Sequence, residues 1–232
     1  MSDKQALLLL PGLLCDERLW RDQARDLTDI AEPIIADLSL DDSVESMAAR
    51  VLAAAPPRFA LAGLSMGGYV AFEILRQQPE RVSRLALLDT SAAPDSPARA
   101  EQRRAGLRLL ERGRFVGVTR QFLPTLVHPR HVHSTIGAEV QAMAQRVGAQ
   151  AYRRQQSAIL RRPDSRPLLA SIAVPTLVVV GEDDVLTPPA AAEEIQRGIA
   201  GAVLARLPDC GHLPTMEDPS RASRLLRQWL TW

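Results

Sequence analysis

Gly63-Leu64-Ser65-Met66-Gly67 decides the fold of this sequence, because it sets a serine between two glycines in a G-x-S-x-G pattern. An apolar run at 59–62 comes before it and predicts a short buried strand, and a helix-compatible run at 69–78 comes after it. A serine at such a strand–turn–helix junction is held on a sharp, strained turn with its hydroxyl exposed. The glycines have a steric reason to be there, since a side chain at either position would collide with the neighbouring strand or helix. We therefore predict that Ser65 is a nucleophile; a Gly-Ser turn that fits by chance is the alternative.

A serine nucleophile needs a histidine to take its proton, and the chain contains four histidines. Three of them cluster mid-chain between residues 128 and 133, and the fourth is His212. His212 stands in a loop with Gly and Pro beside it, shortly after the apolar run 203–207 that predicts a strand. Because a histidine on such a loop is free to reach across strand ends, His212 is the predicted general base. A solvated loop histidine is the alternative.

Three carboxylates follow the β-branched run 176–180, which predicts another buried strand. They are Glu182, Asp183 and Asp184, and Gly181 separates them from the strand. The carboxyl end of a strand is where a parallel α/β sheet presents its chemistry. An acid here would accept a hydrogen bond from the histidine, fix its tautomer and stabilise the imidazolium. Spacing alone leaves Asp183 and Asp184 both open for that role.

Four blocks of the chain together resemble the α/β-hydrolase superfamily, in particular its small, cap-bearing serine esterases. The blocks span nearly the whole chain in the family's order and are 7–13 (LLLLPGL), 63–68 (GLSMGG), 181–188 (GEDDVLTP) and 211–212 (GH). In the family the third block reads G-x-x-D-x-x-x-P, which selects Asp184 over Asp183 because Pro188 falls where the pattern needs it. The resemblance therefore implies a catalytic triad of Ser65, Asp184 and His212.

The first block departs from the family, whose members usually carry His-Gly after this strand, where this chain has Pro11-Gly12. The resemblance implies an oxyanion hole made by two backbone amides. They belong to Leu13, which follows the glycine, and Met66, which follows the nucleophile. Because backbone donors do not depend on side-chain identity, the hole can survive the change, while Pro11 stiffens the loop.

Apolar runs alternate with helical patterns along most of the chain, and this alternation is typical of a parallel sheet. The predicted strands are 6–10, 33–36, 59–62, 82–88, 176–180 and 203–207, and the predicted helices are 17–27, 43–54 and 221–232 together with the helix after Ser65. The chain starts directly on the strand that leads to the oxyanion loop, so the antiparallel hairpin that usually opens this fold is expected to be missing. We predict an α/β-hydrolase fold with a mostly parallel sheet of about six strands flanked by helices.

Strand patterns stop between residues 92 and 165, where the sequence is helical in character. The predicted helices there are 98–112, 115–123, 134–150 and 153–160. The family inserts its cap at this place. The resemblance therefore implies a hydrolase core made of residues 1–91 and 166–232, and a helical cap insertion at 92–165.

The predicted cap carries several apolar side chains that could line an acyl or aryl pocket, although most of them could equally hold the cap helices together. They are Phe115, Phe122, Leu123, Leu126, Met143 and Tyr152. Arg- and Gln-rich runs at 102–104 and 153–156 are expected to be solvated faces. Because aromatic residues make up only 4% of the chain, we predict a mainly aliphatic pocket. Area-proportional apolar binding there would favour short-to-medium acyl chains over charged acids.

The composition disfavours several other classes of function. The 28 basic and 27 acidic residues nearly cancel, so nothing indicates a nucleic-acid partner. Two cysteines in 232 residues indicate a reducing compartment rather than a disulfide scaffold. No run approaches the roughly 20 apolar residues of a membrane span, so we expect no membrane partner and a cytoplasmic location. The mid-chain histidines lack the spacing of a zinc site, so no metal is expected, and no P-loop or G-x-G-x-x-G motif indicates a cofactor.

These observations predict a serine hydrolase that cleaves carboxylic esters of small or medium acyl chain through an acyl-enzyme intermediate, with no cofactor. Its predicted partners are a small-molecule ester and water. A C–C bond hydrolase, an enol-lactonase, a thioesterase and a perhydrolase would use the same triad and remain open, because fold does not settle function. A ligand-binding protein that kept the fold without catalysis is the remaining alternative, and three filled triad positions argue against it.

Overall fold

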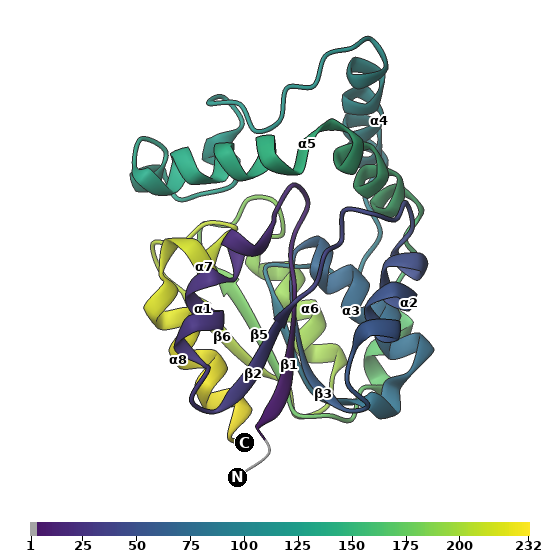
Figure 1. The fold of residues 1–232 in the computed structure, drawn as a ribbon, viewed down its shortest axis with the longest axis vertical. Helices are drawn as coiled ribbons and strands as arrows, with labels where there is room; N and C mark the ends of the chain where they lie inside the picture. The colour runs from purple at the N-terminus through teal and green to yellow at the C-terminus, as the bar shows by residue number, and fades with distance from the viewer. Residues whose placement is uncertain (1–3) are drawn as a thin grey trace.

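Residues 4–232 are described by a computed structural model, and their centre is a six-stranded sheet with helices on both faces (Figure 1). The strands are β1 (Gln5–Leu10), β2 (Ala31–Ile35), β3 (Phe59–Leu64), β4 (Val82–Leu88), β5 (Thr176–Gly181) and β6 (Val203–Leu207). They lie in the order β2-β1-β3-β4-β5-β6, and every neighbouring pair within residues 4–232 is parallel. The predicted parallel sheet of six strands is therefore confirmed.

The sheet is apolar on both faces, as expected for parallel strands that helices cover on either side. Alternate residues of β1 divide between two cores, so that Leu8 lies in one and Leu9 in the other. The helices of the first face are α2 (Val44–Ala54), α3 (Met66–Gln77) and α6 (Pro189–Gly198), and those of the second are α1 (Arg21–Asp26) and α8 (Pro219–Leu230). The central strands β3 and β5 are buried along their whole length, whereas the edge strands β2 and β6 are partly exposed.

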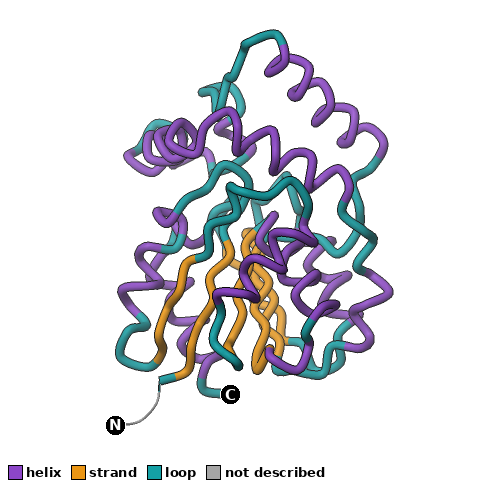
Figure 2. Tube along the Cα trace, turned by 45° about the vertical axis from the view of Figure 1, so that its right-hand side comes forward, coloured by secondary structure: helices purple, strands orange, loops and turns teal. Residues whose placement is uncertain are grey.

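The chain between β4 and β5 forms an inserted segment, residues 92–165. Its helices are α4 (Pro97–Glu111) and α5 (Thr135–Arg161). Both lie over the carboxyl ends of the strands, in the view of Figure 1 and in the rotated view of Figure 2. The two ends of the segment meet, because the N–H of Ser165 donates to the carbonyl of Ala92 at 2.8 Å. The segment therefore leaves the sheet and returns to it at one point.

Short helices complete the described chain. They are η1 (Glu17–Leu19), η2 (Pro79–Arg81), η3 (Leu123–Thr125), η4 (Pro129–His131), η5 (Arg166–Ser171) and α7 (Pro214–Glu217). The predicted helix 17–27 is accordingly divided into η1 and the short α1. The predicted helix 115–123 is wrong, because the chain there is irregular until η3. Gly113 and Gly117 adopt left-handed φ angles of 75° and 58°, which a continuing helix excludes.

The helices predicted separately at 134–150 and 153–160 form one long element, α5. A break in it was expected near residue 151, but the only non-helical residue within its bounds is Gly148, with φ 77° and ψ 179°. Glycine has no Cβ and accepts this conformation at little cost, so the two halves of α5 change direction there. Both halves remain over the strand ends.

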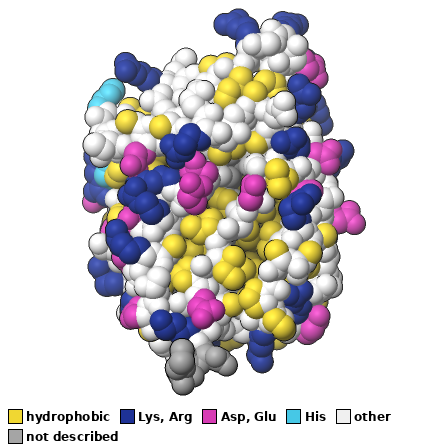
Figure 3. All heavy atoms as spheres, in the orientation of Figure 1, with side chains coloured by type: hydrophobic (Ala, Val, Ile, Leu, Met, Phe, Trp, Pro, Cys, Tyr) yellow, Lys and Arg dark blue, Asp and Glu magenta, His cyan; other side chains and the backbone are white. Residues whose placement is uncertain are grey.

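Strand β2 is an edge of the sheet, since only β1 pairs with it. In Figure 3, apolar side chains gather over this side of the sheet, between α1 and α2. Ile34 on β2 is among the large apolar side chains that solvent reaches. Within residues 4–232, no helix combines the length and the apolar character needed to cross a lipid bilayer.

Candidate active site

Ser65 stands between β3 and α3 with φ 54° and ψ −115°, a conformation that residues other than glycine rarely adopt. A Cβ on Gly67 would overlap the carbonyl oxygen of Leu10, and a Cβ on Gly63 would overlap the backbone of Gly67. The two glycines therefore let β1, β3 and α3 approach closely enough to hold the turn. From the end of β4, Thr90 Oγ1 donates to the Ser65 carbonyl at 2.7 Å.

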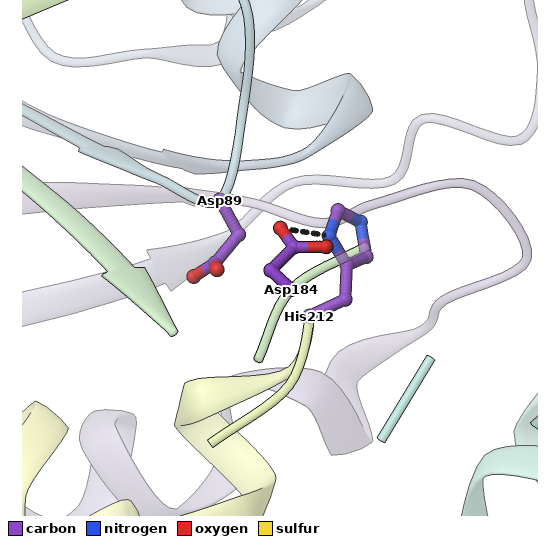
Figure 4. Close-up of side chains that lie close together, drawn as sticks. All are labelled: Asp89, Asp184 and His212. Atoms are coloured by element: carbon purple, nitrogen blue, oxygen red, sulfur yellow. Dashed lines mark hydrogen bonds and ion pairs between the residues drawn. The ribbon is translucent and has the colours of Figure 1, made fainter. Parts of the chain in front are cut away.

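Three strand ends bring Ser65, Asp184 and His212 together. Ser65 follows β3, Asp184 lies in the loop after β5, and His212 lies in the loop after β6. His212 Nε2 is 2.9 Å from Ser65 Oγ. His212 Nδ1 is 2.8 Å from Asp184 Oδ2, and Figure 4 shows this contact. Asp183 takes no part: its side chain is 48% exposed, and its carboxylate is 3.8 Å from His128 Nε2. The family's glycine-to-proline spacing thus selects the aspartate that contacts the histidine.

The Asp184 carboxylate is held by a set of hydrogen bonds besides the one to His212. The N–H groups of Leu186 and Thr187 donate to Oδ1 at 2.8 and 3.1 Å, and the Thr187 hydroxyl donates to Oδ2 at 2.6 Å. Burial acts to raise the pKa of Asp184, but the charge and hydrogen bond of His212 and the bonds from Thr187 hold that pKa below its usual range. Asp184 is therefore ionised. Thr187 was not predicted, although it lies in the same G-x-x-D-x-x-x-P block.

A buried carboxylate holds the loop that carries His212. Glu217, on α7, accepts the N–H of Gly211 at 3.1 Å and of Leu213 at 3.0 Å, the residues on either side of the histidine. It also accepts the N–H of His128, from the inserted segment, at 2.7 Å. Glu217 therefore fixes the histidine loop on both sides and ties it to the inserted segment. Glu217 was not predicted. The sequence feature that could have indicated it is an acidic residue on the short helix α7, which starts two residues after the histidine.

The loop after β1 lies directly beside Ser65. A Cβ placed on Gly12 would be 3.4 Å from the Cβ of Ser65. The N–H of Leu13 donates to no acceptor within residues 4–232. Met66 is the first residue of α3, where N–H groups have no partner inside the helix. Both amides predicted for the oxyanion hole are thus unpaired within the described chain.

Gln155, on α5, anchors the same loop. Its Oε1 accepts the N–H of Leu14 at 3.0 Å, and its Nε2 donates to the carbonyl of Leu38 at 3.2 Å. Gln155 is buried, so the prediction that 153–156 forms a solvated face is wrong at this position. Pro11 offers the loop no polar side chain of its own, and Gln155 supplies an anchor from the opposite side.

A cavity of about 290 Å³ opens above Ser65 and His212. Four of the six apolar candidates of the inserted segment line it: Phe122, Leu126, Met143 and Tyr152. The core loops contribute as well, which was not predicted, through Leu13, Leu14, Leu186 and Leu213. The cavity therefore lies between the strand ends and the inserted segment.

Phe115 and Leu123, the other two candidates, do not line the cavity. Leu123 is 1% exposed and belongs to the core that joins the inserted segment to the sheet. Phe115 packs against Tyr152, with ring centroids 5.7 Å apart and an interplanar angle of 58°.

One wall of the cavity is polar. It consists of Arg99, Gln102, Arg103 and Gln156. The prediction of a mainly aliphatic pocket is wrong on this side, and so is the prediction that 102–104 is a solvated face throughout, although Arg104 is exposed. The reason is that Arg99 and Arg103 are one helical turn apart, so both project from the side of α4 that lies over the cavity.

Comparison with known proteins places the chain in a family. The family model described as "Alpha/beta hydrolase family" matches residues 7–224. The chain belongs to this family. The superfamily predicted from the four sequence blocks is thereby confirmed, and the protein is a hydrolase.

Relatives of this hydrolase include esterases. The pimeloyl-[acyl-carrier protein] methyl ester esterase of Nitrosomonas europaea is 29% identical over 190 residues, which cover 79% of this chain and 74% of that protein. A thermophilic esterase from Thermogutta terrifontis is 31% identical, with a TM-score of 0.85 over 98% of this chain and 89% of that one. The enol-lactonase from Burkholderia xenovorans LB400 has a TM-score of 0.84 at 23% identity, covering 100% of this chain and 93% of its own, and shows the shared fold.

The hydrolase has two free cysteines, Cys15 and Cys210. Cys15 lines the cavity and is therefore a rival to the serine as nucleophile. Burial, and next the charge of Asp16, raise the pKa of the Cys15 thiol to about 12, so it stays protonated at neutral pH. Ser65, in contact with His212, is the better placed group to attack.

Another buried carboxyl group, Asp89, follows β4 and lies beside Asp184 and His212 (Figure 4). Potential ligand atoms of the three residues lie within 4.8 Å of one another. Asp89 Oδ1 accepts the N–H of Gly181 at 2.9 Å, whereas Oδ2 has no partner within the described chain. Burial, and then the charge of Asp184, raise the pKa of Asp89 well above its usual range. Both ring nitrogens of His212 are already in hydrogen bonds, so the group offers no imidazole lone pair to a metal.

Proposed function

We propose that this hydrolase cleaves carboxylic esters of small or medium acyl chain, with Ser65 as nucleophile, His212 as general base and Asp184 as the acid that orients His212. The observation that carries the proposal is a continuous hydrogen-bonded relay at the floor of a cavity. It runs over 2.9 Å from Ser65 Oγ to His212 Nε2 and over 2.8 Å from Nδ1 to Asp184 Oδ2. The esterases among the relatives support ester chemistry.

The first half-reaction forms the acyl-enzyme. His212 Nε2 takes the proton of Ser65 Oγ as that oxygen attacks the ester carbonyl carbon, and ionised Asp184 stabilises the imidazolium. The tetrahedral intermediate collapses, the bond to the alkoxide breaks, and His212 gives its proton to the leaving alcohol. In the second half-reaction His212 takes a proton from the attacking water and returns it to Ser65 Oγ as the carboxylic acid leaves.

The backbone amides of Leu13 and Met66 form the proposed oxyanion hole. Both belong to segments that flank Ser65, and both are unpaired within the described chain. The N-terminal end of α3 adds its partial positive charge at the same place. In comparable sites the loss of one such donor costs about 3 kcal/mol of transition-state stabilisation.

The inserted segment, residues 92–165, is proposed to act as a cap on a hydrolase core made of 1–91 and 166–232. The hydrogen bond between Ser165 and Ala92 at its two ends supports this division, as does its contribution to the cavity wall. The proposed partners are a small-molecule ester, bound under the cap, and water.

Active-site labelling and a substrate panel test the proposal. The wild-type protein should be labelled by a fluorophosphonate probe and should hydrolyse p-nitrophenyl esters faster than thioesters, lactones or dienolic C–C substrates. Ser65→Ala should lose the label and about 10⁶-fold in kcat, with an unchanged melting temperature because the hydroxyl carries chemistry rather than packing. Ester turnover by Ser65→Ala within tenfold of wild type would reject the nucleophile. Faster turnover of a lactone, thioester or C–C substrate would reassign the reaction, and an unlabelled, inactive wild type would leave the ligand-binding alternative.

A further inference from the structure

Four charged side chains meet at the wall of the cavity that α4 provides. They are Asp95, Arg99, Arg103 and Arg162. Arg162 Nη2 is 2.9 Å from one oxygen of Asp95, and Arg103 Nε is 2.6 Å from the other. Arg99 Nε lies farther from the carboxylate, at 3.7 Å. Arg99 and Arg103 line the same cavity as Ser65.

Asp95 balances only one of the three guanidinium charges. Asp95 and Arg162 form a buried ion pair, since each side chain is 6% exposed. Arg162 also stacks on the Tyr69 ring, with its guanidinium carbon 4.2 Å from the ring centroid. Guanidinium groups stay charged in proteins, so Arg99 and Arg103 leave a surplus of positive charge at the cavity wall. No Asp or Glu occurs among the described residues that line the cavity.

Arg99 and Arg103 each have one Nη group that donates no hydrogen bond within the described chain. Arg103 Nη1 donates to Gln156 Oε1 at 2.9 Å, and Arg99 Nη1 donates to the carbonyl of Leu186. Within residues 4–232, the Nη2 of neither arginine donates a hydrogen bond. These two Nη2 groups belong to cationic side chains on the wall of the cavity, and the proposed nucleophile lies on its floor. They are therefore suited to bind an anionic group of the substrate.

We infer that the preferred ester carries a carboxylate at the far end of its acyl chain, and this inference rests on the proposed function. Arg99 and Arg103 bind the carboxylate while the ester carbonyl lies at Ser65. Two Nη2 donors match the two oxygens of a carboxylate. A cavity of about 290 Å³ suits a short chain. The substrate class is therefore the half-ester of a short dicarboxylic acid, whose hydrolysis releases the alcohol and the dicarboxylate. This reverses the preference for uncharged acyl chains predicted from the sequence.

Two esters of nearly the same shape test the inference. They are p-nitrophenyl hydrogen adipate and p-nitrophenyl 6-methylheptanoate, in which an isopropyl group replaces the carboxylate. Wild type should have a kcat/KM about tenfold higher for the adipate ester. Arg99→Gln should lower the charged-to-neutral ratio of kcat/KM about tenfold to a hundredfold, mainly through KM, because a charge-assisted hydrogen bond is lost. Arg104→Gln, at an exposed position of the same helix, is the matched control and should keep the wild-type ratio.

Each failure has a distinct meaning. A wild-type preference for the isopropyl ester, or an equal change of the ratio in Arg99→Gln and Arg104→Gln, would overturn the inference. Inhibition by inorganic phosphate as strong as inhibition by adipate would overturn the assignment to a carboxylate. If wild type hydrolyses neither ester and the fluorophosphonate leaves Ser65 unlabelled, the proposed function itself fails. Because Arg99 is partly exposed on the helix surface, we expect its replacement to leave the fold intact, and a melting curve checks this.

Discussion

At the floor of the cavity, Ser65 and His212, with Asp184 behind them, follow β3, β6 and β5, and hydrogen bonds hold the backbone at each position. On the wall, Arg99 and Arg103 reach from α4 on long side chains, and one of them is partly open to solvent. The floor is positioned by the sheet, whereas the wall is positioned by the meeting of two helices outside it.

This difference between floor and wall suggests different roles, with the floor suited to the proposed chemistry and the wall to selection of the substrate. A side chain on a fixed backbone with few rotatable bonds loses little entropy when the transition state forms. A long arginine has rotamers to choose from and can follow substrates of different shape. Substitutions on the floor should therefore act on kcat, and substitutions on the wall should act on KM and on the ranking of substrates.

After the loss of Ser65 itself, the largest effect is expected from a substitution at Asp184, which can be compared with its neighbour Asp183. Asp184→Asn should lose about 10⁴-fold in kcat, because the amide favours the wrong histidine tautomer and no longer stabilises the imidazolium. Asp183→Asn is the matched control, since its exposed carboxylate has no contact with His212, and it should stay within about tenfold of wild type. Steady-state kinetics on p-nitrophenyl esters measures both. Equal losses in the two variants would contradict the separation.

Glu217→Gln tests whether the backbone around His212 matters in addition to the three proposed catalytic side chains. The variant keeps its shape but loses the charge and one acceptor oxygen of a carboxylate that takes three backbone N–H groups. Hydrogen bonds to charged groups contribute about 1.5–3 kcal/mol, so kcat should fall about tenfold to a hundredfold with little change in KM. The melting temperature should fall too. Exposed Glu80→Gln is the control, and identical kinetics in the two variants would remove the positioning role.

Two adjacent residues of the inserted segment distinguish lining the cavity from packing. Phe122 is 45% exposed and lines the cavity, so Phe122→Ala should change KM a few-fold along a C2-to-C12 ester series and barely change stability. Leu123 is 1% exposed in the core, so Leu123→Ala should cost about 2–5 kcal/mol of stability and keep the ranking of chain lengths. Melting curves measured beside the ester series separate the two. A ranking that changes only in Leu123→Ala would refute the assignment.

The smallest effect is on the pH dependence of stability. Because the pKa of Asp89 is raised above 3.8 by folding, the folded state keeps a proton that the unfolded state releases, and stability falls as pH rises above about 3.8. The lowered pKa of Asp184 has the opposite sign, so its contribution is lost as pH falls below about 3.8. Asp89→Asn keeps an acceptor for Gly181 and tolerates the local φ of 42°. Its melting temperature should exceed that of wild type at pH 8 and converge with it toward pH 4. A lower value at pH 8 would show that Asp89 is charged and stabilising.

Much of the floor was predictable because local rules place it. The G-x-S-x-G turn has few alternative conformations, because Gly67 packs directly against the backbone of Leu10. The spacing from Gly181 to Pro188 distinguishes Asp184 from its neighbour. The strands were predictable because both faces of a parallel sheet are apolar, so each appears as a short apolar run. Glu217 was not predicted, because the sequence alone does not distinguish a buried acid on a helix from a solvent-exposed one. The distinction depends on its backbone partners, which lie elsewhere in the fold.

The wall was not predictable because its contacts cross long stretches of chain. Arg103 meets Gln156 across 53 residues, and no local pattern tells which side of α4 turns toward the strand ends. Charged and amide side chains at helical spacing usually face solvent. Here Arg99, Arg103 and Gln156 line the cavity between the helices and the strand ends instead. The error at 115–123 has a different origin, since Gly117, with its left-handed backbone, interrupts the apolar pattern within this segment.

The hydrogen bond from Leu14 to Gln155 gives the molecule an interlock. Gln155 moves with α5, and Leu14 follows Leu13, the proposed oxyanion donor. A displacement of α5 would break this bond, and a buried polar group left unpaired costs about 1–3 kcal/mol. It would also release the loop after β1, which carries the proposed oxyanion donor Leu13. On the proposed function, Ser65 is therefore best supported while Gln155 holds Leu14, and a displacement of α5 that broke this bond would be expected to slow acylation.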